Sequence, residues 1–209
     1  MDSHYEGDQN ICRISVMVSG GGTNLQAVID GVADGRIPNA RITLVLSSRD
    51  GVYSLERANK AGIPTKVISK ADYPDEEEKA DAIIAALEEA GSDLIVMAGY
   101  VSILSRKVCR AFAGRMINIH PALLPKHGGP GYYGIHVHEA VLAAGDKESG
   151  ATVHYVADGE VDGGEIILQG SVPVLDDDTP ETLQQRVLTV EHRIIVEGTA
   201  LALKRLRAQ

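Results

Sequence analysis

Apolar runs alternate with amphipathic stretches along the first 120 residues of the chain. The apolar runs predict buried strands over 12–19, 40–47, 65–69, 93–99 and 115–120. Between them, the apolar spacing predicts helices over about 23–33, 52–61 and 105–112, and one more that begins at Pro74 and stops at Gly91. Strands that alternate with helices of this length indicate a parallel sheet with right-handed crossovers.

The pattern changes after residue 136. A short helix is expected over 137–144, and the segments 150–157 and 164–174 read as antiparallel strands around a turn. A long helix from about Pro180 closes the chain. The expected fold is therefore α/β, a Rossmann-like open sheet that is mainly parallel, with an antiparallel C-terminal strand pair and a long C-terminal helix.

Length and the character of the N-terminus set the domain organisation. The 209 residues fit one domain over 11–209, and the polar residues 1–10 are expected to form a disordered tail rather than a signal peptide. The chain contains no apolar run near the roughly 20 residues that a membrane helix needs. We therefore expect a single domain without a membrane partner.

Charge and cysteine content narrow the partners and the compartment. A formal charge of −9 argues against non-specific nucleic-acid binding, although a local pocket could still bind an anionic small molecule. The two cysteines, Cys12 and Cys109, lie far apart and make no Cys-x-x-Cys pair, so buried free thiols and a cytoplasmic location are expected.

Ligands of open α/β sheets bind beyond the carboxyl ends of the strands, and three stretches are expected at such ends. The first, Ser-Gly-Gly-Gly-Thr-Asn at 19–24, opens a helix. Gly22 would let the backbone approach a ligand, while Thr23 or Asn24 could cap a helix whose free N–H groups face an anion. The stretch is neither a Walker loop nor a dinucleotide fingerprint, and a plain tight turn is the alternative reading.

The second stretch is Asn-Ile-His-Pro-Ala-Leu-Leu-Pro at 118–125. Asn118 and His120 are two residues apart, so they share one face of an extended chain. Pro121 restricts the backbone of His120 to an extended conformation. The pair suggests a general acid/base beside a hydrogen-bond donor, and the alternative is a structural histidine at a strand end.

The third stretch, 157–166, places Asp158, Glu160 and Asp162 in a glycine-rich turn. The turn could simply be solvated. Alternatively, one of its carboxylates points at His120 and raises the basicity of the imidazole.

The segment 126–138 is rich in glycine and histidine. His136 and His138 could ligate a metal, but the His-Glu-x-x-His pattern fails and no third ligand is evident, so no metal is expected. A mobile loop over the site is the preferred reading.

Four stretches together, at 19–27, 97–105, 114–129 and 154–174, resemble the folate-dependent formyltransferases. The resemblance runs from about residue 12 to 205, and its glycine-rich start points to the branch that acts on glycinamide ribonucleotide. It implies direct transfer of a formyl group from 10-formyltetrahydrofolate, as cosubstrate, to the amine of that ribonucleotide in purine biosynthesis, through a tetrahedral intermediate.

The resemblance also implies a role for individual residues. Asn118 would hydrogen-bond the formyl oxygen and contact the folate, His120 would assist the tetrahedral intermediate, and Asp162 would hold His120 in place. The implied substrate contacts are Gly22, Thr23 and Asn24 for the phosphate and Glu191 for the ribonucleotide. The implied folate pocket is formed by Val101, Ser102, Ile103 and Leu104.

Three other functions are weighed against this one. Formyltetrahydrofolate hydrolase shares the catalytic trio but is expected to carry an extra N-terminal domain, and methionyl-tRNA formyltransferase is expected to carry an extra C-terminal one. A folate- or nucleotide-binding module without catalysis would need no acid/base. The expected partners are thus the two small-molecule substrates, with neither nucleic acid nor membrane, and the protein is expected to be a monomer or a homodimer.

Overall fold

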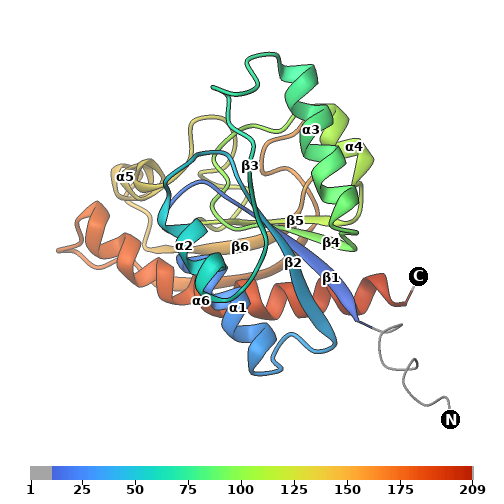
Figure 1. Cartoon of the computed structure of the whole chain (residues 1–209). Helices are drawn as coiled ribbons and strands as arrows, with labels where there is room; N and C mark the ends of the chain where they lie inside the picture. Colours follow the sequence, from blue (N-terminus) through green and yellow to red (C-terminus); the bar gives the residue numbers. More distant parts are fainter. Residues whose placement is uncertain (1–10, 209) are drawn as a thin grey trace, which may run out of the picture.

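The computed structural model describes residues 11–208, so the tail expected at 1–10 lies outside the described residues (Figure 1). The described part contains one sheet of seven strands in the order β3-β2-β1-β4-β5-β6-β7. The strands are β1 (Cys12–Val18), β2 (Ala40–Ser47), β3 (Thr65–Val67), β4 (Leu94–Met97), β5 (Met116–His120), β6 (Glu148–Tyr155) and β7 (Ile166–Pro173).

The direction of the strands changes on both sides of β6. Strands β1 to β5 run parallel to their neighbours, whereas β6 runs antiparallel to β5 and β7 antiparallel to β6. The predicted α/β fold, with a mainly parallel open sheet, an antiparallel C-terminal pair and a long last helix, is confirmed.

Helices cover both faces of the sheet (Figure 1). They are α1 (Thr23–Ala33), α2 (Tyr53–Lys60), α3 (Glu76–Glu89), α4 (Arg106–Ala111), α5 (Ile135–Ala143) and α6 (Pro180–Leu206). Buried residues of α1, α5 and α6 belong to one apolar cluster, and those of α3 and α4 belong to a second cluster on the opposite face. Strand β1 contributes Val16 to the first cluster and Met17 to the second, so both of its faces are buried. This explains why the strands are continuously apolar in sequence.

The start of α3 differs from the prediction. The helix begins at Glu76 rather than at Pro74, because the carboxylate of Asp75 accepts hydrogen bonds from the backbone N–H groups of Glu77 and Glu78 and thereby caps the helix. Ser105 caps α4 in the same manner by accepting from Val108. Side-chain capping therefore shifts both helix starts by one or two residues.

Strand ends also differ slightly from the predicted ones. Strand β3 lies at the edge of the sheet and pairs with β2 only over Thr65–Val67, so it ends two residues early. Strand β6 begins at Glu148 because that residue still pairs with Pro173 of β7. Both cysteines are free thiols, and Cys109 is buried as predicted, but Cys12 is only half-buried.

We predict that Gly198 is required for packing of α6 on the sheet. A β-carbon at this position would lie 2.8 Å from Cγ1 of Val153 on β6. Gly198→Val should lower the free energy of unfolding by about 1–3 kcal/mol, since overpacking displaces neighbours. Urea unfolding measures this. Leu201→Ala, at an exposed position of the same helix, serves as the control, and an unchanged midpoint in Gly198→Val would contradict the prediction.

Candidate active site

A cavity of about 660 Å³ opens where the parallel strands β1, β4 and β5 end. Almost all of the residues selected from the sequence line it: Thr23, Asn24, Val101, Ser102, Ile103, Leu104, Asn118, His120, Asp162 and Glu191. Gly22 is not among the lining residues. The structure thus gathers four separate stretches of the chain, together with Glu191 of α6, around one space.

The glycine-rich turn adopts a backbone conformation that differs from the predicted cap. Gly22 is the residue before the first turn of α1 and has φ 73°, and neither Thr23 nor Asn24 caps the helix with its side chain. A β-carbon on Gly22 would lie 2.6 Å from Cβ of Ser54. Glycine is therefore required here by the left-handed backbone and by the close approach of α2, whatever the ligand. The first turn of α1 keeps N–H groups without a side-chain cap, as an anion site requires.

The side chain of Asn24 turns instead toward α6. Its Nδ2 donates to Oε2 of Glu191 at 2.7 Å, and both residues are buried. Burial raises the pKa of Glu191, while the hydrogen bond from Asn24 partly opposes this. Within the described residues, Oδ1 of Asn24 has no hydrogen-bond partner. A buried acid and an unused amide oxygen on the cavity wall are suited to a ligand that donates hydrogen bonds, such as a sugar hydroxyl or an amine.

Asn118, His120 and Asp162 form a contact cluster. Nδ1 of His120 lies 3.4 Å from Oδ2 of Asp162, and Nδ2 of Asn118 donates to Oδ1 of Asp162 at 3.4 Å. The backbone N–H of Gly129 also donates to Oδ2 of Asp162, at 3.0 Å. The side chains of His120 and Asp162 are only 4% and 8% exposed, so these contacts act in a setting of low dielectric.

Asp162 reaches this cluster by a route that the sequence did not indicate. Because β6 is antiparallel to β5, its end lies beside the beginning of β5, where the N–H of Val156 donates to the carbonyl of Met116. The third stretch was expected to follow the carboxyl end of a parallel strand. It follows the antiparallel strand β6 instead. It folds back along the sheet and places Asp162, with φ 60°, against His120.

The other two acids of this turn take different positions. Asp158 forms ion pairs with Arg106 at 2.9 Å and with Arg110 at 2.6 Å, which anchors the turn to α4. Glu160 lines the cavity. Among the three candidate carboxylates, Asp162 is the one in contact with His120.

Hydrogen bonding decides where protons sit on His120. Its Nε2 lies 2.7 Å from the carbonyl oxygen of His127, so this nitrogen donates and the neutral ring leaves Nδ1 unprotonated. Burial lowers the pKa of His120, and the charge of Asp162 and the His127 carbonyl act in the opposite direction. Asp162 thus favours protonation as predicted, but burial outweighs it. The result is a neutral imidazole whose Nδ1 faces a carboxylate that would stabilise an added proton.

The carboxylate itself stays ionised. Burial acts to raise the pKa of Asp162, but the neighbouring imidazoles of His154 and His120 and the N–H of Gly129 together hold the pKa below its usual value. These partners surround the carboxylate on several sides.

His154 of β6 is a cavity residue that the sequence reasoning missed. Its Nδ1 donates to the carbonyl of Tyr155 at 2.9 Å, so Nε2 accepts from Nδ2 of Asn118 at 3.2 Å. The register of the antiparallel pair places it directly beside Asn118. The alternation Thr-Val-His-Tyr-Val was a signal for a strand, but only the register makes His154 a neighbour of the cluster.

The segment Val101–Leu104 forms an apolar part of the cavity wall between β4 and α4. It is tied to the glycine-rich turn, since the N–H of Val101 donates to Oγ of Ser19 at 3.0 Å. Val101 and Ile103 are 44% and 69% exposed. Exposed apolar side chains at a cavity mouth are typical of a site that binds a flat organic ligand.

Neither a metal centre nor a membrane span is found in the part of the chain from 11 to 208. No cluster of three His, Cys, Asp or Glu side chains there is placed to bind a metal, and no helix there is long and apolar enough to cross a membrane. His136 is exposed and contacts Glu139, whereas His138 is buried and burial lowers its pKa to about 4.

Comparison with known proteins places these features in a family. The model of a family described as formyl transferase matches residues 12–199. The chain belongs to the formyl transferase family. Phosphoribosylglycinamide formyltransferase of Haemophilus influenzae is 43% identical over 182 residues, which are 87% of this chain and 82% of that protein.

Two further relatives show how the domain is used elsewhere in the family. The trifunctional purine biosynthetic protein adenosine-3 of Drosophila melanogaster is 44% identical over 197 residues, but the match spans 90% of this chain and only 14% of that protein. The crystal structure of glycinamide ribonucleotide transformylase 1 from Symbiobacterium toebii superposes with a TM-score of 0.87 at 40% identity, over 98% of this chain and 92% of that one.

We predict that the imidazole of His120 titrates below the ordinary pKa of about 6.5 for histidine, because burial outweighs its acceptors. Asp162→Asn should lower this pKa further, since it removes a charge that favours the protonated ring. NMR titration of labelled histidine measures both values. An unchanged or raised pKa in Asp162→Asn would show that the carboxylate does not act on the ring.

Proposed function

We propose that this protein transfers a formyl group from 10-formyltetrahydrofolate to the primary amine of glycinamide ribonucleotide, a step of purine biosynthesis. The names of the similar proteins from Haemophilus influenzae and Symbiobacterium toebii support this reaction. The observation that carries it is a single cavity in which the Asn118, His120 and Asp162 cluster lies with an anion-binding turn and an apolar wall. The reaction joins an amine that carries a phosphate to a flat cosubstrate. It therefore needs the cluster, the anion-binding turn and the apolar wall together.

The chemistry proceeds by addition and elimination. The amine nitrogen attacks the formyl carbon, a new carbon–nitrogen bond forms, and the carbonyl electron pair moves to oxygen as an oxyanion. The amine thereby becomes an ammonium and releases one proton. Collapse of the intermediate breaks the bond between the formyl carbon and the folate nitrogen, which receives a proton as it leaves. The enzyme forms no covalent bond, so no serine or cysteine nucleophile is required.

His120 accepts the proton of the ammonium. In the neutral ring Nε2–H is committed to the carbonyl of His127, so the proton is accepted at Nδ1, where Asp162 stabilises it. A lowered pKa keeps the ring neutral and ready before the attack. The same proton then passes to the departing folate nitrogen, a positioned acid/base step that typically contributes about 10²–10⁴-fold.

Asn118 stabilises the oxyanion. Its amide donates to Nε2 of His154 at 3.2 Å and to Oδ1 of Asp162 at 3.4 Å. The longer contact is the weaker one, so the substrate oxygen replaces Asp162 as acceptor while His154 keeps the amide oriented. A donor aimed at a developing oxyanion contributes about 2.7–4 kcal/mol.

The two substrates take separate parts of the cavity. The phosphate lies at the N-terminus of α1 beside Gly22, Thr23 and Asn24, where free N–H groups and the positive end of the helix dipole offset the protein's negative charge. Glu191 contacts the ribonucleotide. The folate lies against Val101, Ser102, Ile103 and Leu104 and reaches Asn118 with its formyl group.

The same proposal includes the organisation of the protein. Residues 11–209 form one formyltransferase domain, as the family match over 12–199 supports. The two free thiols support a cytoplasmic location. The protein acts as a monomer or a homodimer on small-molecule substrates, and size-exclusion chromatography coupled to light scattering distinguishes these two states.

Formyltetrahydrofolate hydrolase is the second candidate, because the same cluster could direct water at the formyl carbon. Incubation with 10-formyltetrahydrofolate, with and without glycinamide ribonucleotide, separates the two functions. Transfer requires the ribonucleotide and yields formylglycinamide ribonucleotide, whereas hydrolysis yields formate in its absence. Formate release that is independent of the ribonucleotide would contradict the transferase proposal.

We predict that His120→Ala lowers kcat by at least about 10²-fold, because the reaction loses its positioned acid/base. Asp162→Asn should also reduce kcat severely, since the protonated imidazole loses its stabilising charge. Steady-state kinetics measure both, with circular dichroism as the check on folding. Asp177→Asn, at an exposed position that does not line the cavity, is the control. Near-normal turnover in both active-site variants would refute these assignments.

We predict that the first turn of α1 determines affinity for the ribonucleotide alone. Thr23→Val and Asn24→Ala should raise KM for glycinamide ribonucleotide about tenfold or more, because the first removes a hydroxyl beside the phosphate and the second removes the hydrogen-bond partner of Glu191, and a hydrogen bond to a charged group contributes about 1.5–3 kcal/mol. KM for the folate should change little, and inorganic phosphate should compete with the ribonucleotide.

The matched control for this turn is Asp30→Asn, at an exposed position farther along α1. Gly22→Val is not a suitable variant, because its side chain would collide with Ser54 and disturb the fold. If Thr23→Val and Asn24→Ala weaken only the folate, the turn belongs to the other substrate.

A further inference from the structure

Residues 127–129 contact both members of the acid/base pair through their backbone. The carbonyl of His127 accepts from Nε2 of His120 at 2.7 Å, and the N–H of Gly129 donates to Oδ2 of Asp162 at 3.0 Å. The position of this three-residue segment therefore determines the orientation of the imidazole and of the carboxylate. The contacts that hold this segment in place therefore affect the acid/base pair.

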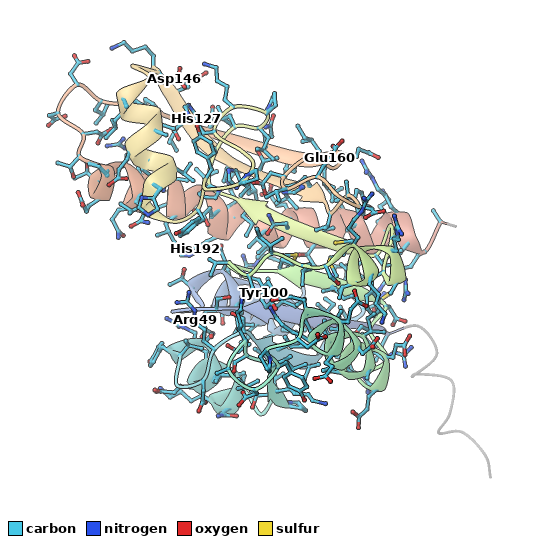
Figure 2. All side chains as sticks on the ribbon, turned by 90° about the horizontal axis from the view of Figure 1, so that it is seen from above. Arg49, Tyr100, His127, Asp146, Glu160 and His192 are labelled. Carbon is cyan, nitrogen blue, oxygen red and sulfur yellow. The ribbon has the colours of Figure 1, made fainter. Side chains whose placement is uncertain are left out.

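The side chain of His127 provides an anchor on the far side of the segment. Its Nε2 lies 2.8 Å from Oδ2 of Asp146, which follows α5, and the two side chains are 14% and 19% exposed. Figure 2 labels both residues, and they lie near one another beside α5. Lys126 donates to the other oxygen of Asp146 at 2.8 Å. The hydrogen bond from Lys126 has the larger effect and that from His127 the next, and both lower the pKa of Asp146. The anchoring carboxylate is therefore negatively charged.

Backbone conformation shows that the segment depends on such an anchor. His127 has φ 52°, in the left-handed region that residues other than glycine adopt only when their surroundings enforce it. Two glycines follow it, and they add no side-chain contact. His127 and Asp146 also border a second cavity, of about 290 Å³, so packing does not enclose the pair on that side. The hydrogen bond between the two side chains therefore restrains the orientation of His127, together with the edge contact of its ring with Tyr132.

We propose that His127 is a positioning residue for the acid/base pair, and that Asp146 anchors it so that its carbonyl stays on Nε2 of His120. This proposal rests on the proposed formyl transfer. It assigns a role in that reaction to residues that lie behind the cavity. His127 does not line the cavity that holds the cluster. It acts through the ring that it orients and through the tautomer that its carbonyl selects.

This role predicts a change in pH dependence that a merely structural role would not produce. The groups that act electrostatically on His120 are Asp162, His154, His127 and His138. Burial is the largest effect and lowers the pKa of His120, Asp162 and the His127 carbonyl raise it, and the rings of His154 and His127 lower it. Withdrawal of the carbonyl should therefore lower this pKa. Because the neutral ring is the base, the acidic limb of the kcat profile should move to lower pH.

The test compares His127→Phe and Asp146→Ala, two changes that remove the same hydrogen bond from opposite sides. Each should lower kcat between about tenfold and about a hundredfold, since a misplaced catalytic group loses up to about 10²-fold. KM for both substrates should stay within about twofold. The acidic limb should shift to lower pH in both variants, and the double variant should be no worse than either single one, because the two residues act as a pair.

Two further variants serve as controls. Lys126→Met removes the other partner of Asp146 but leaves the contact with His127, and should keep the wild-type profile. Asp146→Asn keeps an oxygen that accepts from Nε2 of His127, and should recover most of the activity lost in Asp146→Ala. Thermal unfolding shows whether each variant is folded at the assay temperature, and His127→Phe keeps the test valid if Asp146→Ala unfolds.

The outcomes separate this inference from the proposed function. If the wild-type protein showed no formyl transfer, the proposed function itself would be overturned. An active wild type with an unchanged kcat and acidic limb in both His127→Phe and Asp146→Ala would overturn the positioning role alone. Loss of activity in Asp146→Asn as large as in Asp146→Ala, or strictly additive losses in the double variant, would also overturn it.

Discussion

The carboxylate of Asp162 is the contact on which the candidate active site depends. It touches the amide of Asn118, the imidazoles of His120 and His154, and the backbone N–H of Gly129. These partners come from β5, from β6 and from the loop before α5. A buried charge with this many partners is stabilised by each of them, and the loss of a partner without a replacement is costly. Asp162 therefore joins three segments that are otherwise separate in the chain.

The change of strand direction at β5 makes this arrangement possible. In a purely parallel sheet the neighbour of β5 would run in the same direction as β5, and a crossover helix would connect the two strands. Here β6 runs antiparallel, so His154 lies directly beside Asn118 and the turn after β6 can fold back over the sheet. The topology thus supplies a second histidine and a carboxylate to a strand that carries only Asn118 and His120 itself.

Two buried acids in the same cavity show how neighbours set acidity. Within the described residues Glu191 is hydrogen-bonded to Asn24, and burial raises its pKa, which favours the neutral form. Asp162 is also buried, but its several donors and histidines hold its pKa low and keep it charged. The site therefore holds two acids in different states. Asp162 is a charged carboxylate beside His120, whereas Glu191, at the α1 end, favours the neutral form and is suited to hydrogen bonding. The larger number of donors around Asp162, together with the deeper burial of Glu191, accounts for the difference.

The sequence by itself determined the layered α/β fold and a large part of the site. Apolar strands that alternate with amphipathic helices leave few ways to bury both faces of a sheet, and residues two apart on a strand must share a face, as Asn118 and His120 do. Tertiary structure alone decided which acid of the turn after β6 meets His120. It also turned Asn24 toward Glu191 instead of into a helix cap, and brought His154 and the carbonyl of His127 to the cluster. These contacts depend on strand register and on the path of loops, which are set by packing between residues distant in the chain, whereas local patterns record only the periodicity of single elements.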